Sequence, residues 1–336
     1  MTNGASHHAA GGLDFGDSQL TARIQKGLAE VEDLMVAELS SGEPFIAEKV
    51  THLLNAGGKR FRPMIALLAS EFGETPAADN VIRSAAIVEM VHLATLYHDD
   101  VMDEADTRRG VPSANARWDN TVAILSGDYL LATMSRLLSE TDLETVRHFS
   151  DTFGELVVGQ MRETIGAGEA NAVEHYLTVI EEKTGVLIAS AAYLGARHAG
   201  APAEHVEALS KAAAGIGIVF QIADDIIDIF SDADDSGKTP GTDLREGVFT
   251  LPVLYALEEE SPAGDELRGL LTGPLTNDED VSRALELIAL TDGRSRATAL
   301  IHTYLADVDA HLEALPDIPA REALRTISRY TVERVG

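Results

Sequence analysis

The sequence of 336 residues contains no cysteine, and only 5% of its residues are aromatic. The lack of cysteine excludes disulfides, thiolate metal sites and cysteine nucleophiles, and fits a reducing, cytoplasmic location. With so few aromatic residues, the hydrophobic content of 45% comes chiefly from aliphatic side chains, and alanine and leucine recur at helical spacing. This pattern predicts an all-α protein.

Positive charge is also scarce. Lys and Arg total 26 against 55 Asp and Glu, which gives a net charge of −29 and argues against nucleic acid or an anionic membrane as the main partner. The basic residues of interest fall in two islands, Lys59-Arg60-Phe61-Arg62 and Arg108-Arg109. No apolar run approaches the roughly 18 residues of a transmembrane helix, so we expect no transmembrane segment.

The first residues, 1–17, are rich in Gly, Ser, His and Ala and lack the apolar core of a signal peptide. We expect a disordered N-terminal tail there and no export. The remaining residues, 18–336, show no short repeat and no clear linker, so they are predicted to form one domain.

The most informative feature of the sequence is a cluster of three aspartates that follows an apolar run. The helix-like run 85–97 leads into Asp99, Asp100 and Asp103, at spacing i, i+1, i+4. On a helix these carboxylates share one face and repel each other, so a cation is expected among them, and hard oxygen ligands favour Mg²⁺. Arg108 and Arg109 follow and suit phosphate oxygens. Taken alone, the cluster could also be a solvated acidic helix end.

A second apolar run, 213–230, repeats the pattern with Asp224, Asp225 and Asp228, and Gln221 lies one turn before Asp224 and Asp225. Two such clusters within apolar helices are hard to explain by solvation. Facing each other across a cavity, they could hold several Mg²⁺ ions around one diphosphate.

Two further features point to anions. Gly57-Gly58 precedes Lys59 and Arg62 at an expected helix start, where backbone amides can cradle an anion, although a surface helix cap would look the same. His92 lies seven residues before Asp99, nearly in phase with it on a helix, although a lone histidine on an apolar helix is usually a hydrogen-bonded core residue.

The ordered set of motifs resembles the trans-type isoprenyl diphosphate synthase (polyprenyl synthetase) family, most of all its long-chain members. The set comprises Gly-Gly-Lys-Arg-Phe-Arg-Pro from Gly57, the first Asp motif with Arg-Arg-Gly, Lys183-Thr-Gly, and Phe-Gln-x-x-Asp-Asp-x-x-Asp with its following Gly-Lys. This resemblance implies a single-domain helical bundle around a central active-site cavity, the isoprenoid synthase fold, and a homodimer.

The resemblance also implies residue roles in a Mg²⁺-dependent prenyl transfer. The metal ligands, for roughly three Mg²⁺ per active site, would be Asp99, Asp100, Asp103, Asp224, Asp225 and Asp228. The catalytic set would be Asp99, Asp103, Asp224, Lys183 and Arg108. Residues expected to bind isopentenyl diphosphate are Lys59, Arg62, His92 and Arg109, and those expected to bind the allylic diphosphate are Arg108, Lys183, Thr184 and Lys238. Gln221 is also expected to bind substrate.

In this reaction the allylic diphosphate leaves, and the double bond of isopentenyl diphosphate attacks the resulting carbocation. The sequence departs from the family at Val248, where many members have a lysine that this side chain cannot replace. That departure puts one contact to the diphosphate in doubt and removes no predicted metal ligand.

The resemblance implies that product length depends on the residues at positions 94 and 95, here Ala94 and Thr95. They lie about 6–8 Å along the helix from Asp99, at 1.5 Å per residue. In family members that make short products, one or both positions tend to be bulky. The small residues here suggest a hexaprenyl to decaprenyl product of the kind attached to quinones.

The alternatives are a geranylgeranyl or farnesyl diphosphate synthase, a class I terpene cyclase or squalene-type synthase, and a non-catalytic subunit of a heteromeric synthase.

Overall fold

The computed structural model describes residues 15–230 and 240–333. Apart from one two-stranded hairpin, the regular secondary structure of these residues is helical, so the all-α prediction is confirmed. The chain divides into two compact units. Unit 1 comprises Met1–Thr152, Ser190–Ser210 and Leu315–Leu324, and unit 2 comprises Phe153–Ala189, Lys211–Ala314 and Arg325–Gly336. The single domain over 18–336 and the tail over 1–17 stay predictions, and most of that tail lies outside the described residues.

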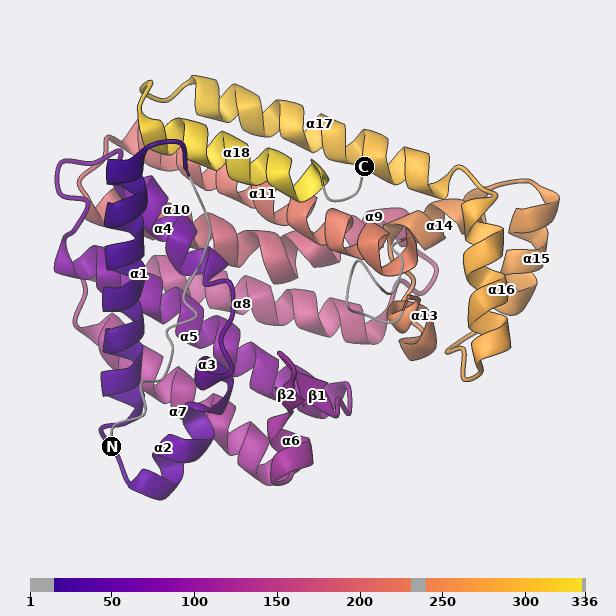
Figure 1. The fold of residues 1–336 in the computed structure, drawn as a ribbon, viewed down its shortest axis with the longest axis horizontal. Helices are drawn as coiled ribbons and strands as arrows, with labels where there is room; N and C mark the ends of the chain where they lie inside the picture. The colour runs from indigo at the N-terminus through magenta and orange to yellow at the C-terminus, as the bar shows by residue number, and fades with distance from the viewer. Residues whose placement is uncertain (1–14, 231–239, 334–336) are drawn as a thin grey trace. The chain divides into compact units, whose positions relative to one another are not determined.

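Unit 1 is built around one long central helix, α5. Its own elements are α1 (Ser18–Leu39), α2 (Pro44–Val50), α3 (His52–Asn55), α4 (Phe61–Ser70), α5 (Asp79–Met102), β1 (Thr107–Arg108), β2 (Val111–Pro112), α6 (Ala114–Arg117) and α7 (Asn120–Ser139). Helices α1, α4 and α7 all pack against α5 (Figure 1). Because α5 is covered on several sides, its residues from Val81 to Tyr97 are mostly buried all round the helix, as expected for a core helix.

The apolar runs 85–97 and 213–230 are helical, as predicted. The segment around 45–55 forms α2 and α3 with a break at Thr51, and α4 begins at Phe61, close to the helix start expected after Gly57-Gly58. Pro63 lies in the first turn of α4, where its missing N–H costs no helical hydrogen bond.

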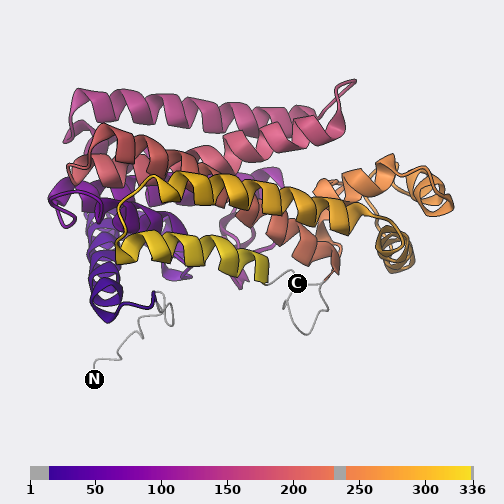
Figure 2. The same cartoon turned by 90° about the horizontal axis from the view of Figure 1, so that it is seen from above.

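Unit 2 contains α9 (Ala172–Ile180), η1 (Glu181–Gly185), α13 (Thr242–Glu246), α14 (Leu251–Glu258), α15 (Pro262–Leu270), α16 (Asp278–Ala289) and α17 (Gly293–Glu313). Four helices contribute residues to both units: α8 (Leu143–Ile165), α10 (Val186–His198), α11 (Ala203–Phe230) and α18 (Pro319–Glu333). Within unit 2, α15 and α16 pack together and lie beyond one end of α17 (Figure 2). Ile222 and Ile226 of α11 are buried in one cluster with Ala297 and Ile301 of α17, which fixes the rotation of α11 about its axis.

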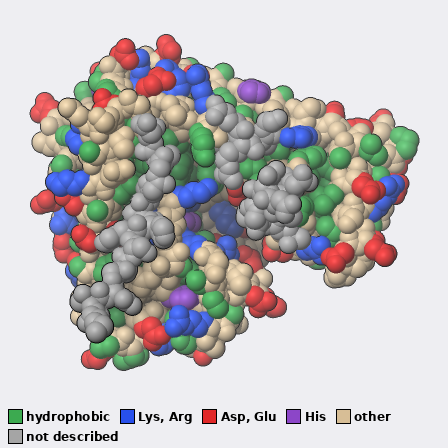
Figure 3. All heavy atoms as spheres, viewed as in Figure 1, with side chains coloured by type: hydrophobic (Ala, Val, Ile, Leu, Met, Phe, Trp, Pro, Cys, Tyr) green, Lys and Arg blue, Asp and Glu red, His purple; other side chains and the backbone are tan. Residues whose placement is uncertain are grey.

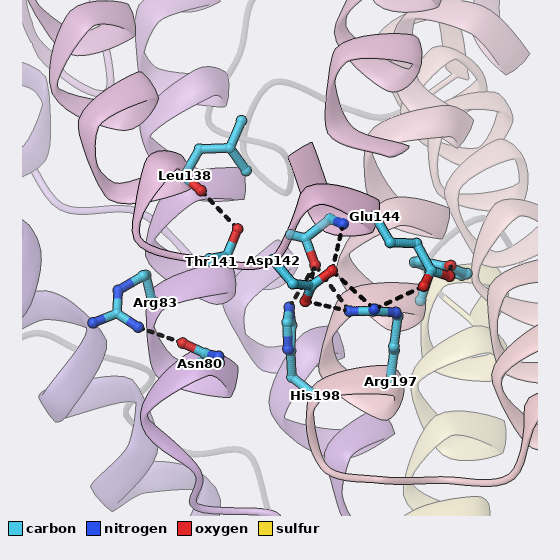
Figure 4. Close-up of polar contacts among 10 residues, drawn as sticks. Asn80, Arg83, Leu138, Thr141, Asp142, Glu144, Arg197 and His198 are labelled. Atoms are coloured by element: carbon cyan, nitrogen blue, oxygen red, sulfur yellow. Dashed lines mark hydrogen bonds and ion pairs between the residues drawn. The ribbon is translucent and has the colours of Figure 1, made fainter. Parts of the chain in front are cut away.

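A polar network in unit 1 joins the start of α8 to the end of α10 (Figure 4). Asp142 accepts a hydrogen bond from the Thr145 amide at 3.0 Å, in the manner of an N-cap, and it also pairs with Arg197 at 2.9 Å. Arg197 reaches Glu144 as well, at 3.0 Å, and His198 Nε2 lies 3.0 Å from Thr145 Oγ1. These contacts hold the two helix ends together, and none of their residues was predicted to act in the site.

Acidic and basic side chains are interspersed along the edges of the face drawn in Figure 3. Many of them form ion pairs within their own unit, for example Arg23 with Glu71 in unit 1 and Arg283 with Glu266 in unit 2. In the part of the chain that the structure describes, no helix combines the length and the apolar character needed to cross a bilayer.

Candidate active site

The first aspartate cluster lies where α5 ends, in unit 1. Asp99 and Asp100 belong to its last turn, and Asp103 is the C-cap, whose backbone N–H donates to the Asp99 carbonyl at 2.8 Å. The three side chains differ in exposure: Asp100 is fully buried, Asp99 is partly buried and Asp103 is exposed. The helical spacing expected from the sequence is therefore present.

Asp100 is paired with Arg108. Arg108 Nε donates to Asp100 Oδ1 at 2.6 Å, whereas Asp100 Oδ2 is buried and has no hydrogen-bond partner among the described residues. Burial raises the pKa of the Asp100 carboxyl, and Arg108 opposes that rise. A buried carboxylate oxygen without a partner is costly unless something cationic or protic meets it. This oxygen therefore fits a divalent cation held by the cluster.

A short hairpin presents the two arginines. Thr107 pairs with Pro112 and Arg108 with Val111, and the turn residues Arg109 and Gly110 have φ values of +55° and +75°. Positive φ at both central residues is the mark of a type I′ turn, whose twist matches a two-residue hairpin. The sequence analysis did not predict these strands, because two residues are too few to show a period of two.

The glycine turn before α4 contacts the Arg109 side chain closely. Arg109 donates from one terminal nitrogen to the carbonyls of Leu53, at 3.0 Å, and Gly57. A Cβ added to Gly58 would lie 2.9 Å from the centre of the Arg109 guanidinium, so this position requires glycine for space as well as for its φ of +145°. These contacts of Arg109 hold the hairpin against the glycine turn.

Arg60 is a residue whose role sequence reasoning missed. It is 4% exposed, with φ of +47°, and its guanidinium contacts Glu89 at 3.4 Å, Glu32 at 3.5 Å and the Leu54 carbonyl at 2.8 Å. Its neighbour Lys59 has an exposed side chain. Lys59, Arg60 and Arg62 are neighbours of the same charge. The sequence therefore does not show that Arg60 is buried and binds protein groups, whereas Lys59 and Arg62 are predicted to bind phosphate.

Arg62 and His92 lie in an environment that lowers the pKa values of both side chains. Burial lowers the pKa of Arg62 to about 10, with Arg109 adding to the fall and Glu89 opposing it, and the buried Nε of Arg62 has no hydrogen-bond partner among the described residues. Burial also lowers the pKa of His92 well below its usual range, and Arg62, Arg109, Arg108 and Arg60 push it further down. The histidine is therefore neutral at pH 7 and can donate one ring N–H.

The second aspartate cluster lies near the end of α11, in unit 2. Asp225 and Asp228 are 5% and 8% exposed, and Asp224 is partly buried. Asp228 Oδ2 accepts from the backbone N–H of Asp243 at 3.4 Å, and Asp243 adds negative charge beside Asp225. Asp243 is a fourth acidic residue that the sequence analysis missed, because a single aspartate in a turn-rich segment carries no pattern.

Both oxygens of Asp225 are held by neutral donors. The Tyr176 hydroxyl donates to Oδ2, and Gln221 Nε2 donates to Oδ1 at 3.0 Å. Burial raises the pKa of the Asp225 carboxyl to about 8, with Asp243 adding to the rise, whereas the hydrogen bonds from Tyr176 and Gln221 oppose it. Gln221 was predicted to bind substrate; in the structure its amide contacts Asp225.

Lys183 and Thr184 lie in η1, a turn of π-helix between α9 and α10. Such bulges occur often at functional sites. Lys183 Nζ pairs with Glu163 Oε2 at 2.5 Å, and Thr184 Oγ1 donates to Gln221 Oε1 at 3.4 Å. A Cβ on Gly159 of α8 would lie 2.8 Å from the Lys183 backbone nitrogen, so this glycine lets α8 approach the π turn closely.

The predicted residues thus fall into two groups, each within one unit. Among the described residues, no three Asp, Glu, His or Cys side chains converge into an assembled metal site. Lys238 lies outside the described residues, and the expectation that the two aspartate clusters face each other stays a prediction. Ala94 is buried in α5 at 1% exposure, and the partly buried Thr95 donates its hydroxyl to the His92 carbonyl.

Comparison with known proteins places these features in a family. The sequence model of the polyprenyl synthetase family matches residues 43–288 of this chain. A nonaprenyl diphosphate synthase of Mycobacterium tuberculosis is 52% identical over 97% of each chain. Among solved structures, a geranylgeranyl pyrophosphate synthase of Corynebacterium glutamicum, complexed with calcium and isoprenyl diphosphate, has a TM-score of 0.89 and 59% identity over 96% of this chain and 100% of that one.

A decaprenyl diphosphate synthase structure from Rhodobacter capsulatus is also similar, with a TM-score of 0.84 and 33% identity over 95% of this chain and 99% of that one. The relatives span nearly the whole chain, and they share its isoprenoid synthase fold. Together with the ordered motifs, these comparisons show that the chain belongs to the polyprenyl synthetase family and is a prenyltransferase.

Proposed function

We propose that the chain condenses isopentenyl diphosphate with an allylic diphosphate to make a long-chain all-trans polyprenyl diphosphate, in a Mg²⁺-dependent reaction. The observation that carries this proposal is Arg62, a partly buried arginine whose Nε is buried and has no hydrogen-bond partner among the described residues, beside Arg109 and a neutral His92. Glu89 offsets part of the positive charge of this cluster, but the buried Nε donor of Arg62 is costly unless an acceptor meets it. A diphosphate supplies that acceptor.

The basic cluster of unit 1 would bind isopentenyl diphosphate. Arg62 and Arg109 offer planar sets of N–H donors that suit phosphate oxygens, and Lys59 adds an exposed positive charge. His92 contributes a hydrogen bond from its neutral ring and keeps its proton. The carbonyls that hold Arg109 fix its guanidinium before substrate arrives, so little ordering is left for the binding step.

The allylic diphosphate would be held by the carboxylates through Mg²⁺ and by basic side chains. We assign the metal, roughly three ions, to both aspartate clusters, and the unpartnered oxygen of Asp100 supports this. When bound, Mg²⁺ would offset the charge of the leaving diphosphate. Lys183 would neutralise more of that charge after exchanging Glu163 for substrate, and Arg108 would sit between the Asp100 carboxylate and a phosphate. Thr184 could donate its hydroxyl to the diphosphate in place of Gln221.

The direct test follows label from isopentenyl diphosphate into an acid-labile prenyl product, with Mg²⁺ and a farnesyl or geranylgeranyl diphosphate primer. We expect incorporation that stops when a chelator removes Mg²⁺ and returns when Mg²⁺ is restored. No incorporation with any allylic primer would contradict the proposal and favour a cyclase or a non-catalytic subunit.

A long chain, from hexaprenyl to decaprenyl and suited to a quinone side chain, is our choice of product. It is supported by the name of the Mycobacterium tuberculosis relative and by the small residues Ala94 and Thr95 on the turns of α5 before the aspartate cluster. The specific alternative is geranylgeranyl diphosphate, supported by the Corynebacterium glutamicum structure at 59% identity. Chromatography of the dephosphorylated products separates the two.

We also propose that the chain acts as a homodimer. Helix α8 exposes an apolar stripe, defined by Val157, Val158, Met161 and Ile165, with exposed fractions from 40% to 78%. An apolar stripe of this length on one helix favours a second protein surface. Light scattering should give twice the chain mass for the wild type and a lower mass for Met161→Glu. The control Leu290→Glu, at an exposed apolar residue of 72% outside the stripe, should remain dimeric.

A further inference from the structure

Tyr176 of α9 makes the hydrogen bond that fixes the orientation of Asp225. Its hydroxyl donates to Asp225 Oδ2, and Gln221 donates to the other oxygen from within α11 at 3.0 Å. Thr184 in turn donates to the Gln221 carbonyl oxygen at 3.4 Å. All four residues belong to unit 2, and together they link the π turn, α9 and the second aspartate cluster by hydrogen bonds.

The carboxylate of Asp225 needs such support because of its neighbours. Asp224 and Asp243 both place negative charge beside it, and its side chain is 5% exposed, so water offers little screening. The hydrogen bonds from Tyr176 and Gln221 counter this repulsion and hold both oxygens of Asp225 in place.

We propose that Tyr176 is a positioning residue: with Gln221 it clamps the Asp225 carboxylate in the orientation in which the second aspartate cluster receives a divalent cation together with a diphosphate. This inference rests on the proposed function, because it assigns the cluster to a metal. Outer hydrogen bonds to metal-binding groups commonly change metal affinity by about 10- to 100-fold when they are removed. Tyr176 would act through Asp225 and need not touch substrate.

Tyr176→Phe tests the hydroxyl alone, because it keeps the ring and its packing. The thermal unfolding midpoint of the full chain is followed as Mg²⁺ is titrated at a fixed concentration of inorganic pyrophosphate. We expect the variant to require about tenfold more Mg²⁺ than the wild type for half of the stabilisation. Its melting without Mg²⁺ should stay close to that of the wild type, which a merely structural role would not predict.

The matched control is Tyr193→Phe, which removes a hydroxyl that donates to a carboxylate elsewhere, Glu144 at 3.4 Å in unit 1. Its Mg²⁺ midpoint should equal that of the wild type. A second variant, Gln221→Met, removes the opposite donor from Asp225 and should also raise the midpoint. If Tyr176→Phe does not fold, Gln221→Met decides whether the clamp matters.

A Tyr176→Phe midpoint equal to that of the wild type overturns the positioning role. So does an equal rise in the Tyr193→Phe control. If the wild type incorporates no isopentenyl diphosphate while Tyr176→Phe still shifts the Mg²⁺ midpoint, the positioning role stands and the proposed synthesis fails. If the wild type is active and the midpoints coincide, only the positioning role fails.

Discussion

Arg108 Nε donates to Asp100 Oδ1 at 2.6 Å, and this contact joins the Arg-Arg island to the first aspartate cluster inside unit 1. The carboxylate has no exposed surface, whereas the arginine side chain keeps 31% of its own exposed. One end of the pair is therefore buried in protein and the other remains accessible to a ligand. A phosphate that contacts Arg108 would thereby be coupled to the charge of Asp100.

We expect Asp100→Asn to lower the rate of prenyl transfer by about 100-fold. The change keeps the shape of the side chain and removes the negative charge that the cation and Arg108 both use. The rate is measured at saturating isopentenyl diphosphate over a range of Mg²⁺ concentrations. Asp33→Asn, the same change at an exposed residue of α1, should leave the rate intact. A rate for Asp100→Asn within twofold of the wild type would remove Asp100 from the metal site.

For Arg62→Met we expect KM for isopentenyl diphosphate to rise by about tenfold or more, because a charged hydrogen bond is worth roughly 1.5–3 kcal/mol. The effect on kcat should be smaller, since the predicted contact binds substrate before and during the reaction alike. Steady-state kinetics against each substrate in turn separates the two constants. Arg23→Met removes another arginine of unit 1, one paired with Glu71, and should leave both constants as they are. An unchanged KM in Arg62→Met would contradict the anion site.

His92 should make stability depend on pH. Its folded pKa lies well below the unfolded value of about 6.5, so the unfolded chain binds the proton more tightly. Its contribution to stability is therefore complete above about pH 6.5 and is lost as pH falls toward the folded pKa. His92→Gln should lose less free energy of unfolding than the wild type when urea titrations are compared from neutral pH down to about pH 5.

Burial also lowers the pKa values of His148 and His198, and both histidines remain in the variant, so their contributions cancel in this comparison. His302→Gln, at an exposed position of α17, serves as the control and should follow the wild type. Parallel curves for His92→Gln and the wild type would mean that His92 is not held neutral by its arginine neighbours.

Gly195 of α10 packs directly on α4. A Cβ there would lie 2.0 Å from the Ala66 carbonyl oxygen, which is backbone and cannot move aside cheaply. Gly195→Ala should therefore destabilise the protein by about 1–3 kcal/mol, despite the better helix propensity of alanine. Gly154→Ala, in α8 with open space around the added carbon, should be neutral or stabilising. Urea denaturation of both variants gives the comparison, and equal stabilities would refute the close contact.

Segments whose apolar residues recur at helical spacing could be predicted from the sequence. The apolar runs of α5 and α11 predicted two helices, and the Asp spacing placed each cluster on them, because helical phase depends only on local geometry. The Gly57-Gly58 pair also indicated the start of a helix, and α4 begins shortly after it. The ordered motifs then identified the family, which carried most of the functional prediction.

Contacts between distant segments did not appear in the sequence. Tyr176 and Asp225 are 49 residues apart and Arg60 and Glu89 are 29 apart, so neither pairing leaves a local pattern. Arg60 and Lys59 are both basic residues, and they differ in the structure because Arg60 is buried whereas Lys59 is exposed. The hairpin at Arg109-Gly110 was missed because its strands are two residues long and its turn depends on positive φ at a non-glycine residue.

Thr95→Phe should shorten the products. Thr95 is partly buried on α5, one turn before Asp99, and a phenyl ring there would take up space expected for the growing chain. Ala94→Phe should act in the same direction, but Ala94 is almost fully buried and the larger side chain also strains the core. Products of unchanged length in Thr95→Phe, with activity retained, would place the end of the chain elsewhere.

The most direct test of the proposed function is the chain length of the wild-type products. Labelled isopentenyl diphosphate is incubated with Mg²⁺ and farnesyl or geranylgeranyl diphosphate, and the dephosphorylated products are resolved by chromatography. The account predicts hexaprenyl or longer alcohols as the final products. Final products that stop at farnesyl or geranylgeranyl would contradict the long-chain assignment while leaving the family intact, and no incorporation at all would contradict the synthase activity itself.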